Sequence, residues 1–142
     1  DAVLPAPAAV TPGEFSGGRE SLLIVDDEDA LRVMLATALS RKGYRITTAA
    51  SGLEAIEFIN DHAQHFDLAV LDLNMPGANG LKVLKAIRLC RPRLKVLIVS
   101  GYVTPDVRVA FEALEQHDIM QKPYALSEIG HRVRSLLDAA AG

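Results

Sequence analysis

The chain contains 142 residues, of which 49% are hydrophobic and 23% charged, and its formal net charge is −3. This length and composition predict one soluble globular domain with a sizeable buried core. The acidic balance gives no reason to expect nucleic-acid binding, and no apolar stretch reaches the roughly 18–20 residues that span a bilayer. The single cysteine, Cys90, excludes an internal disulfide, and low cysteine usage favours a reducing cytoplasm.

Residues 1–20 differ in composition from the rest of the chain. Alanine, proline and glycine dominate them, without a periodic apolar pattern. Such a segment is typical of a flexible linker or tail, and its prolines would interrupt the apolar helix of a secretory signal. We therefore expect a linker over residues 1–20, native or vector-derived, followed by one domain over residues 21–140.

From Ser21 onward, apolar runs alternate with amphipathic stretches five times. Continuous apolar runs are typical of parallel strands that are covered on both faces. Five such units predict an α/β fold, a doubly wound (βα)5 arrangement around a parallel sheet. The second run is the least apolar, which favours a position at the sheet edge. The expected strands are residues 21–25, 44–48, 67–71, 94–99 and 118–121.

The stretches between these runs predict five helices. Apolar residues recur in them every three to four positions, as expected of a helix with one buried face. The first two stripes are Leu31, Met34, Leu35 and Ala38, then Leu53, Ile56 and Ile59. The remaining stripes are Leu81, Leu84 and Ile87, then Val107, Ala110, Phe111 and Leu114, then Leu126, Ile129, Val133 and Leu136.

Polar side chains of a particular kind follow four of the expected strands. Asp26 and Asp27 follow the first strand, Asp72 the third, Ser100 the fourth and Lys122 the fifth. Ligands of a doubly wound sheet bind outside the carboxyl ends of its strands, so we expect these side chains to meet there. Acids, a hydroxyl and an amine are the groups needed to bind a divalent cation and to take up a phosphoryl group.

Each of these residues has a simpler explanation when it is considered alone. Asp26 and Asp27 could cap the first helix, whose free backbone N–H groups favour carboxylates. Asp72 could open a turn, Ser100 could be a local turn hydroxyl, and Lys122 could be a solvated lysine. Four such coincidences at four strand ends are less plausible than one site, so we favour the functional interpretation.

Five short motifs stand at the ends of the expected strands and at the start of the third helix. They are Val25-Asp26-Asp27, Leu71-Asp72-Leu73-Asn74-Met75-Pro76, Asn79-Gly80, Ser100-Gly101 and Lys122-Pro123. Through these motifs, residues 21–138 resemble a response-regulator receiver domain, the CheY-like module of two-component signalling. The resemblance implies a flavodoxin-like fold with strand order 2-1-3-4-5.

The resemblance also implies a phosphoryl acceptor and a metal site. Asp72 would accept a phosphoryl group from a phosphohistidine on a histidine kinase or a histidine-containing phosphotransfer protein. Asp26, Asp27 and Asp72 would bind Mg²⁺ together with the backbone carbonyl of Asn74. Mg²⁺ suits such a set because it prefers oxygen ligands, and it would relieve the repulsion among the carboxylates.

The remaining motif residues would bind the phosphoryl group and transmit its arrival. By the same resemblance, Ser100 and Lys122 would hold phosphoryl oxygens, and the peptide between Lys122 and Pro123 would be cis. Phosphorylation would then change the face formed by helix 4, strand 5 and helix 5, where a downstream protein could bind.

One position departs from the family pattern. Ile119 lies three residues before the lysine, where receivers often carry tyrosine or phenylalanine, so the aromatic form of the switch is not expected. Tyr102, two residues after Ser100, is the nearest substitute. Its simpler interpretation is a loop residue that affects access to the site.

Three functions follow from these residues. A phosphoacceptor switch, with no enzyme activity beyond self-catalysed phosphotransfer and dephosphorylation, is favoured. A Mg²⁺-dependent aspartyl phosphohydrolase would want an acid where this chain has Asn74. An interaction domain that works without phosphorylation is disfavoured by the complete set of site residues.

The wider context of the domain is less well defined. The linker, the first residue being Asp1 rather than methionine, and the loop Ser100-Gly101-Tyr102 favour the receiver of a hybrid sensor kinase over a stand-alone response regulator. No output domain, and hence no nucleic-acid binding in cis, is expected after the last helix.

Overall fold

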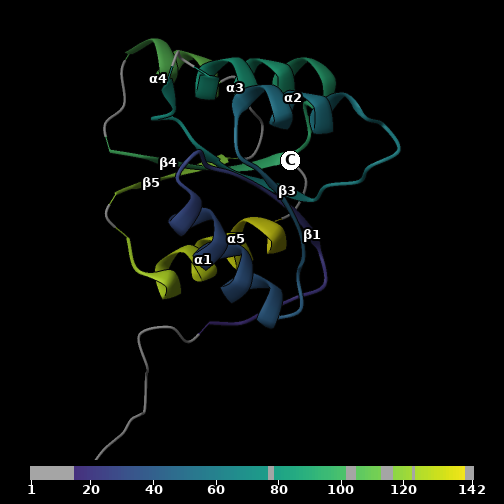
Figure 1. The fold of residues 1–142 in the computed structure, drawn as a ribbon, viewed down its shortest axis with the longest axis vertical. Coiled ribbons are helices and arrows are strands. Elements are labelled where there is room, and N and C mark those ends of the chain that lie inside the picture. The colour runs from purple at the N-terminus through teal and green to yellow at the C-terminus, as the bar shows by residue number, and fades with distance from the viewer. Residues whose placement is uncertain (1–14, 77–78, 102–104, 113–116, 123, 140–142) are drawn as a thin grey trace, which may run out of the picture.

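A computed structural model describes residues 15–76, 79–101, 105–112, 117–122 and 124–139 (Figure 1). Five strands alternate with five helices in this part of the chain, as the sequence predicts. No described helix combines the length and the apolar character needed to cross a membrane. The elements are β1 (Ser21–Val25), α1 (Asp29–Arg41), β2 (Arg45–Ala49), α2 (Gly52–Asn60), β3 (Leu68–Asp72), α3 (Asn79–Cys90), β4 (Lys95–Ser100), α4 (Pro105–Glu112), β5 (His117–Gln121) and α5 (Leu126–Asp138).

The strands form one parallel sheet in the order β2-β1-β3-β4-β5, which confirms the predicted fold and places β2 at an edge. Helices α1 and α5 cover one face, and α2, α3 and α4 lie on the other (Figure 1). β2, β3 and β4 each begin and end one residue later than predicted. Asp72 and Ser100 are therefore the last residues of their strands, where they pair with Val99 and Gln121.

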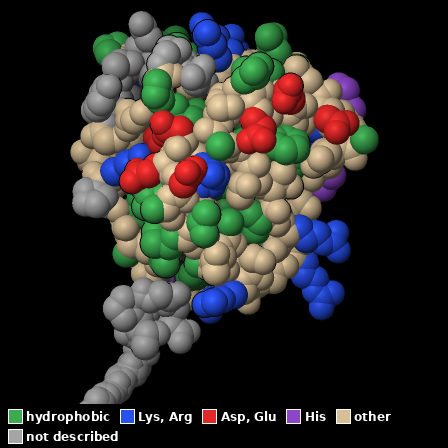
Figure 2. Space-filling view, in the orientation of Figure 1, with side chains coloured by type: hydrophobic (Ala, Val, Ile, Leu, Met, Phe, Trp, Pro, Cys, Tyr) green, Lys and Arg blue, Asp and Glu red, His purple; other side chains and the backbone are tan. Residues whose placement is uncertain are grey.

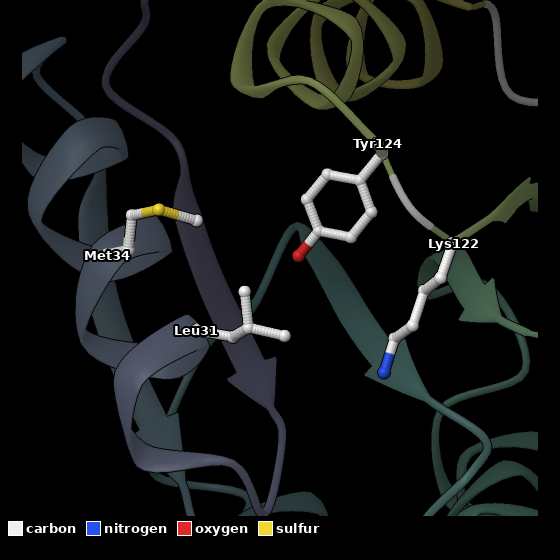
Figure 3. A pocket seen from close by; sticks show the side chains of 4 residues that line it. All are labelled: Leu31, Met34, Lys122 and Tyr124. Carbon is white, nitrogen blue, oxygen red and sulfur yellow. The ribbon is translucent and has the colours of Figure 1, made fainter.

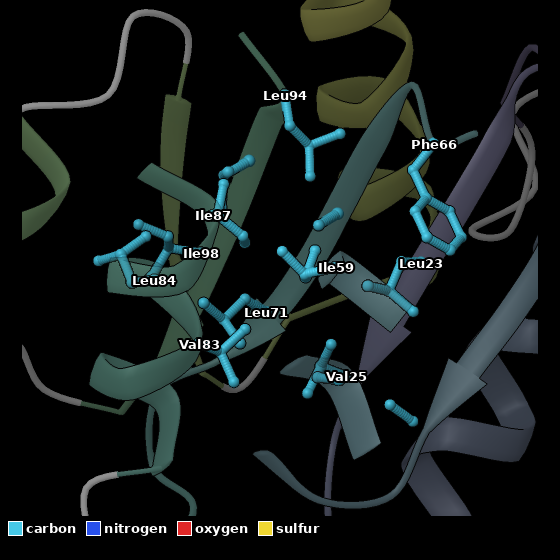
Figure 4. Close-up of a cluster of buried hydrophobic side chains, with 14 of the residues drawn as sticks. Leu23, Val25, Ile59, Phe66, Leu71, Val83, Leu84, Ile87, Leu94 and Ile98 are labelled. Carbon is cyan, nitrogen blue, oxygen red and sulfur yellow. The ribbon is translucent and has the colours of Figure 1, made fainter. Parts of the chain in front are cut away.

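Two hydrophobic clusters hold the helices against the sheet. Alternate residues of a strand point to opposite faces, so Leu22 and Ile24 pack under α1 and α5 while Leu23 and Val25 pack under α2 and α3. Figure 4 shows the cluster under α2 and α3. The three central strands are almost wholly buried, which accounts for their continuous apolar sequence.

Two helices bury a face that overlaps the predicted one but is shifted from it. Met34 and Leu53 were expected to point inward, but both are exposed, Leu53 by 71%. The buried residues of α1 are Leu35 and Leu39, and those of α2 are Gly52, Ala55 and Ile59. Both buried sets keep helical spacing and include the predicted Leu35 and Ile59, so the period was correct and the buried face is shifted by part of a turn.

Phe15, the first described residue, is packed against the domain although it falls in the segment expected to be linker. Phe15 is only 8% exposed, and its ring lies against Gly130 of α5 so closely that a Cβ there would come within 2.2 Å of it. The Lys42 ammonium lies 5.1 Å from the centroid of the same ring. Arg134 of α5 binds Glu20 at 2.6 Å. The described residues 15–20 thus belong to the folded domain.

Candidate functional site

Three carboxylates meet at the carboxyl edge of the sheet. Oxygens of Asp26, Asp27 and Asp72 lie within 4.8 Å of one another, although Asp72 is more than forty residues away along the chain. Asp26 and Asp72 are each 4% exposed, whereas Asp27 is exposed. Figure 2 shows acidic side chains next to basic ones on the face over α1, with hydrophobic side chains beside them.

Backbone N–H groups fix the orientation of the two buried acids. Asp26 Oδ1 accepts a hydrogen bond from the Glu28 N–H, and Asp72 Oδ1 accepts one from the Asn74 N–H, both at 2.8 Å. Each acid thereby closes a tight turn at the end of its strand. Asp72 therefore opens a turn, as its simpler explanation had it, and at the same time lies in the acidic cluster. Asp26 does not cap α1, because the N-cap of that helix is Glu28.

A lysine supplies positive charge to the acidic cluster. The Lys122 ammonium lies 3.1 Å from Asp72 Oδ2. Its backbone N–H donates to the Ser100 carbonyl at 2.9 Å, which places the ends of β4 and β5 side by side. Ser100 is 1% exposed, so its hydroxyl lies inside the site rather than at the surface.

Burial shapes the titration of two groups at this edge. Burial raises the pKa of Asp26 to about 6; the Glu28 N–H opposes the shift and the Asp72 carboxylate adds to it. Burial likewise raises the pKa of Tyr124 to about 12, and the neighbouring acids add to the effect. Burial thus favours the neutral forms of Asp26 and Tyr124.

A cavity adjoins the acidic cluster between α1 and the segment after β5. It has a volume of about 370 Å³ and is lined by Leu31, Met34, Lys122 and Tyr124. Figure 3 shows Leu31 and Met34 on α1 facing Tyr124 across it, with the Lys122 side chain at one end. An apolar hollow thus leads to the amine that pairs with Asp72.

The donor set fits a magnesium ion. Three carboxylates offer hard oxygen ligands, which Mg²⁺ prefers, and the exposed Asp27 leaves a side open to the water ligands that Mg²⁺ retains. Within the described residues, Lys122 is the cation in contact with Asp72, and its ammonium contacts only the Oδ2 atom of that carboxylate. Negative charge therefore exceeds positive charge in the cluster.

Some predicted site residues lie outside the described part of the chain. Tyr102 and Pro123 are among them, and so is the expected cis peptide before Pro123. Ile119 is half-buried in β5 and packs against the cluster under α2 and α3. Gly80 lies where a Cβ would approach the Leu73 Cα to 2.7 Å, which explains the glycine at the start of α3.

Sequence reasoning missed the side chain of Asn74. Its Oδ1 accepts hydrogen bonds from the Gly101 N–H at 2.5 Å and from the Ser100 hydroxyl at 3.3 Å. The sequence predicted a role only for the Asn74 backbone. The signal that could have indicated more is its place, two residues after the buried acid and at the same sheet edge as Ser100.

Comparison with known proteins identifies the arrangement. The profile of the response regulator receiver domain matches residues 22–134. Sensor kinase CckA of Brucella abortus is 32% identical over 85% of this chain. Sporulation initiation phosphotransferase F of Bacillus subtilis is 30% identical over 83% of this chain and 94% of its own length. Response regulator TrrA of Thermotoga maritima, solved in complex with Mg²⁺ and BeF, is 29% identical over 82% of this chain and 98% of its own, with a TM-score of 0.67.

The share of each relative that is matched differs widely. The chain spans 13% of the length of CckA and 50% of the mycobacterial response regulator MprA. The likeness to these proteins therefore concerns one of their parts.

Proposed function

This chain belongs to the response-regulator receiver domain family of two-component signalling, and we propose that Asp72 is its phosphoryl acceptor. Receiver domains take part in signalling with histidine kinases or phosphotransfer proteins, and a phosphohistidine on such a partner is the donor we propose here. The observation that carries the proposal is the pairing of the buried Asp72 with Lys122 beside two further acids.

The proposed transfer is a displacement at phosphorus. A carboxylate oxygen of Asp72 forms a bond to the phosphorus atom while the bond from phosphorus to the histidine nitrogen breaks, and the imidazole leaves with that electron pair. No group is oxidised or reduced. Positioning and charge neutralisation carry most of such a reaction, and the Lys122 ammonium can offset charge on the phosphoryl oxygens.

We propose Mg²⁺ as the cofactor, held by Asp26, Asp27, Asp72 and the backbone carbonyl of Asn74. When bound, the ion neutralises charge on the carboxylates and on the transferred group. The Ser100 hydroxyl, buried beside the cluster, donates to a phosphoryl oxygen. The new charge then alters the face formed by α4, β5 and α5, where a downstream protein binds. Ile119 supplies no aromatic ring for this step.

We propose that the domain serves a sensor kinase, with a stand-alone regulator as the second candidate. Similarity to CckA, a sensor kinase, supports the first. Similarity to phosphotransferase F over 94% of its length supports the second. The gene sequence upstream of residue 1 distinguishes them, because a kinase module is either encoded there or absent.

Labelling with a small acyl phosphate and Mg²⁺ tests the acceptor. The wild type should gain one phosphoryl group by intact mass, and the group should be released by hydroxylamine. Asp72→Asn should gain none, and chelation of Mg²⁺ should prevent labelling of the wild type. Asp61→Asn, at an exposed acid after α2, is the matched control and should label normally. Equal labelling of Asp72→Asn would refute the site, whereas an unlabelled wild type would favour an interaction domain that works without phosphorylation.

A further inference from the structure

The carboxamide of Asn74 ties together two strand ends of the site. Its Oδ1 accepts from the Gly101 N–H and the Ser100 hydroxyl, which follow and end β4. Its own N–H donates to Asp72 Oδ1 at 2.8 Å. The backbone of Asn74 is therefore hydrogen-bonded to the Asp72 carboxylate, and its side chain is hydrogen-bonded to the end of β4.

One of the two donors that Asn74 engages, the Ser100 hydroxyl, is the group proposed above to donate to a phosphoryl oxygen, and the other is the adjacent Gly101 N–H. Ser100 ends the strand next to β3, and the Gly101 N–H is the first backbone donor beyond it. A phosphoryl group brings three acceptor oxygens and a charge of about −1.5 to −2. An anionic oxygen is a stronger acceptor than a neutral amide oxygen, so it competes well for both donors.

We propose that Asn74 is a latch: its side-chain oxygen occupies the phosphoryl-binding donors of Ser100 and Gly101 until a phosphoryl group displaces it. This inference rests on the proposed acceptor role of Asp72. Release of the latch frees the Ser100 hydroxyl and the Gly101 N–H, which links the arrival of charge to a change at the end of β4. The latch also opposes phosphorylation, because both hydrogen bonds must break first.

Removal of the side chain separates this role from metal binding. Asn74→Ala keeps the backbone carbonyl proposed as a magnesium ligand and the N–H that binds Asp72. It loses only the carboxamide. If Asn74 instead stabilised the phosphoryl group through its amide N–H groups, the same change would weaken binding. The two roles therefore predict opposite effects of Asn74→Ala on the affinity for a phosphoryl group or its mimic.

The test uses beryllofluoride, a phosphoryl mimic, at saturating Mg²⁺ with the full chain. NMR titration follows the Gly101 amide in the wild type, in Asn74→Ala and in Asn74→Asp. Without beryllofluoride, the Gly101 amide proton should shift upfield in Asn74→Ala, and Asn74→Ala should bind beryllofluoride about fivefold more tightly than the wild type. Asn60→Ala, an exposed asparagine at the end of α2, is the matched control and should bind like the wild type.

The variant Asn74→Asp keeps an acceptor oxygen and adds charge. It should retain the downfield Gly101 proton and bind beryllofluoride more weakly than the wild type. Equal or weaker binding by Asn74→Ala, or an unmoved Gly101 signal, would overturn the latch while leaving the acceptor role intact. A wild type that binds no beryllofluoride would overturn both.

Discussion

The Lys122 ammonium and the Asp72 carboxylate lie 3.1 Å apart, although 50 residues separate them in the chain. They project from the ends of β5 and β3, which are not neighbours in the sheet, because β4 lies between them. The pair therefore spans the strand that ends in Ser100. Loss of either partner should affect the acidic cluster as a whole rather than one strand end.

Lys122→Ala should destabilise the protein by about 1–3 kcal/mol without metal, because the buried carboxylates lose their neighbouring cation. Saturating Mg²⁺ should recover a larger fraction of stability in the variant than in the wild type, since the ion replaces the missing charge. Urea unfolding with and without MgCl₂ measures both effects. Lys85→Ala, at an exposed lysine of α3, is the control. An equal response of Lys122→Ala and the wild type to Mg²⁺ would contradict this account.

Most of the fold could be predicted because strands that are buried on both faces of the sheet have a continuous apolar sequence. β1, β3 and β4 are almost wholly buried and read as unbroken apolar runs. The phase of α1 and α2 was harder to predict. Leu53 lies in the first turn of a short helix whose inward face carries Gly52 and Ala55, and such small residues weaken the apolar signal.

The meeting of the acids and the lysine at one edge was predictable for a topological reason. Parallel strands place their carboxyl ends on one edge, so Asp26, Asp72 and Lys122 had to come close once the strand order was known. Side-chain hydrogen bonds between loops produce no comparable pattern in the sequence. The contact of Asn74 with Gly101 depends on loop geometry, and the packing of Phe15 depends on the absence of a side chain at Gly130.

Arg91 should contribute to stability without affecting the site. Its guanidinium donates to the carbonyls of Ile59, Asp61 and Gln64 at 2.7–2.9 Å, which binds the end of α2 and the loop that follows it. Arg91→Lys should lower the free energy of unfolding by about 2–3 kcal/mol, because an ammonium cannot reproduce this planar set. Arg93→Lys, at an exposed neighbour, is the control.

The same variant provides a test of location. Acyl-phosphate labelling of Arg91→Lys should match the wild type at a temperature where both are folded, because Arg91 precedes β4 and the acceptor lies at the opposite edge of the sheet. A labelling rate that fell in proportion to stability would show that the two edges are coupled.

Acid should weaken the attachment of the N-terminal segment. The hydrogen bond from Arg134 holds the pKa of Glu20 below its usual 4.5. A carboxyl group with a lowered pKa contributes stability above its unfolded value, and that contribution is lost as the pH falls through the folded value. Glu20→Gln should therefore be less stable than the wild type at pH 7, and the difference should shrink below about pH 4.5. Thermal unfolding across this range measures it, and a constant difference would be inconsistent with the ion pair.

The effect of Gly130→Ala on stability should depend on Phe15 and should change sign when the Phe15 ring is removed. Phe15→Ala should cost about 2–4 kcal/mol, because a buried ring is lost. Gly130→Ala alone should also destabilise, since its Cβ would come within 2.2 Å of that ring. In the Phe15→Ala background the space is empty, so Gly130→Ala should stabilise by up to about 1 kcal/mol through its higher helix propensity. A double-mutant cycle from urea unfolding measures the coupling. Additive effects would show that residues 15–20 do not pack on α5 in solution.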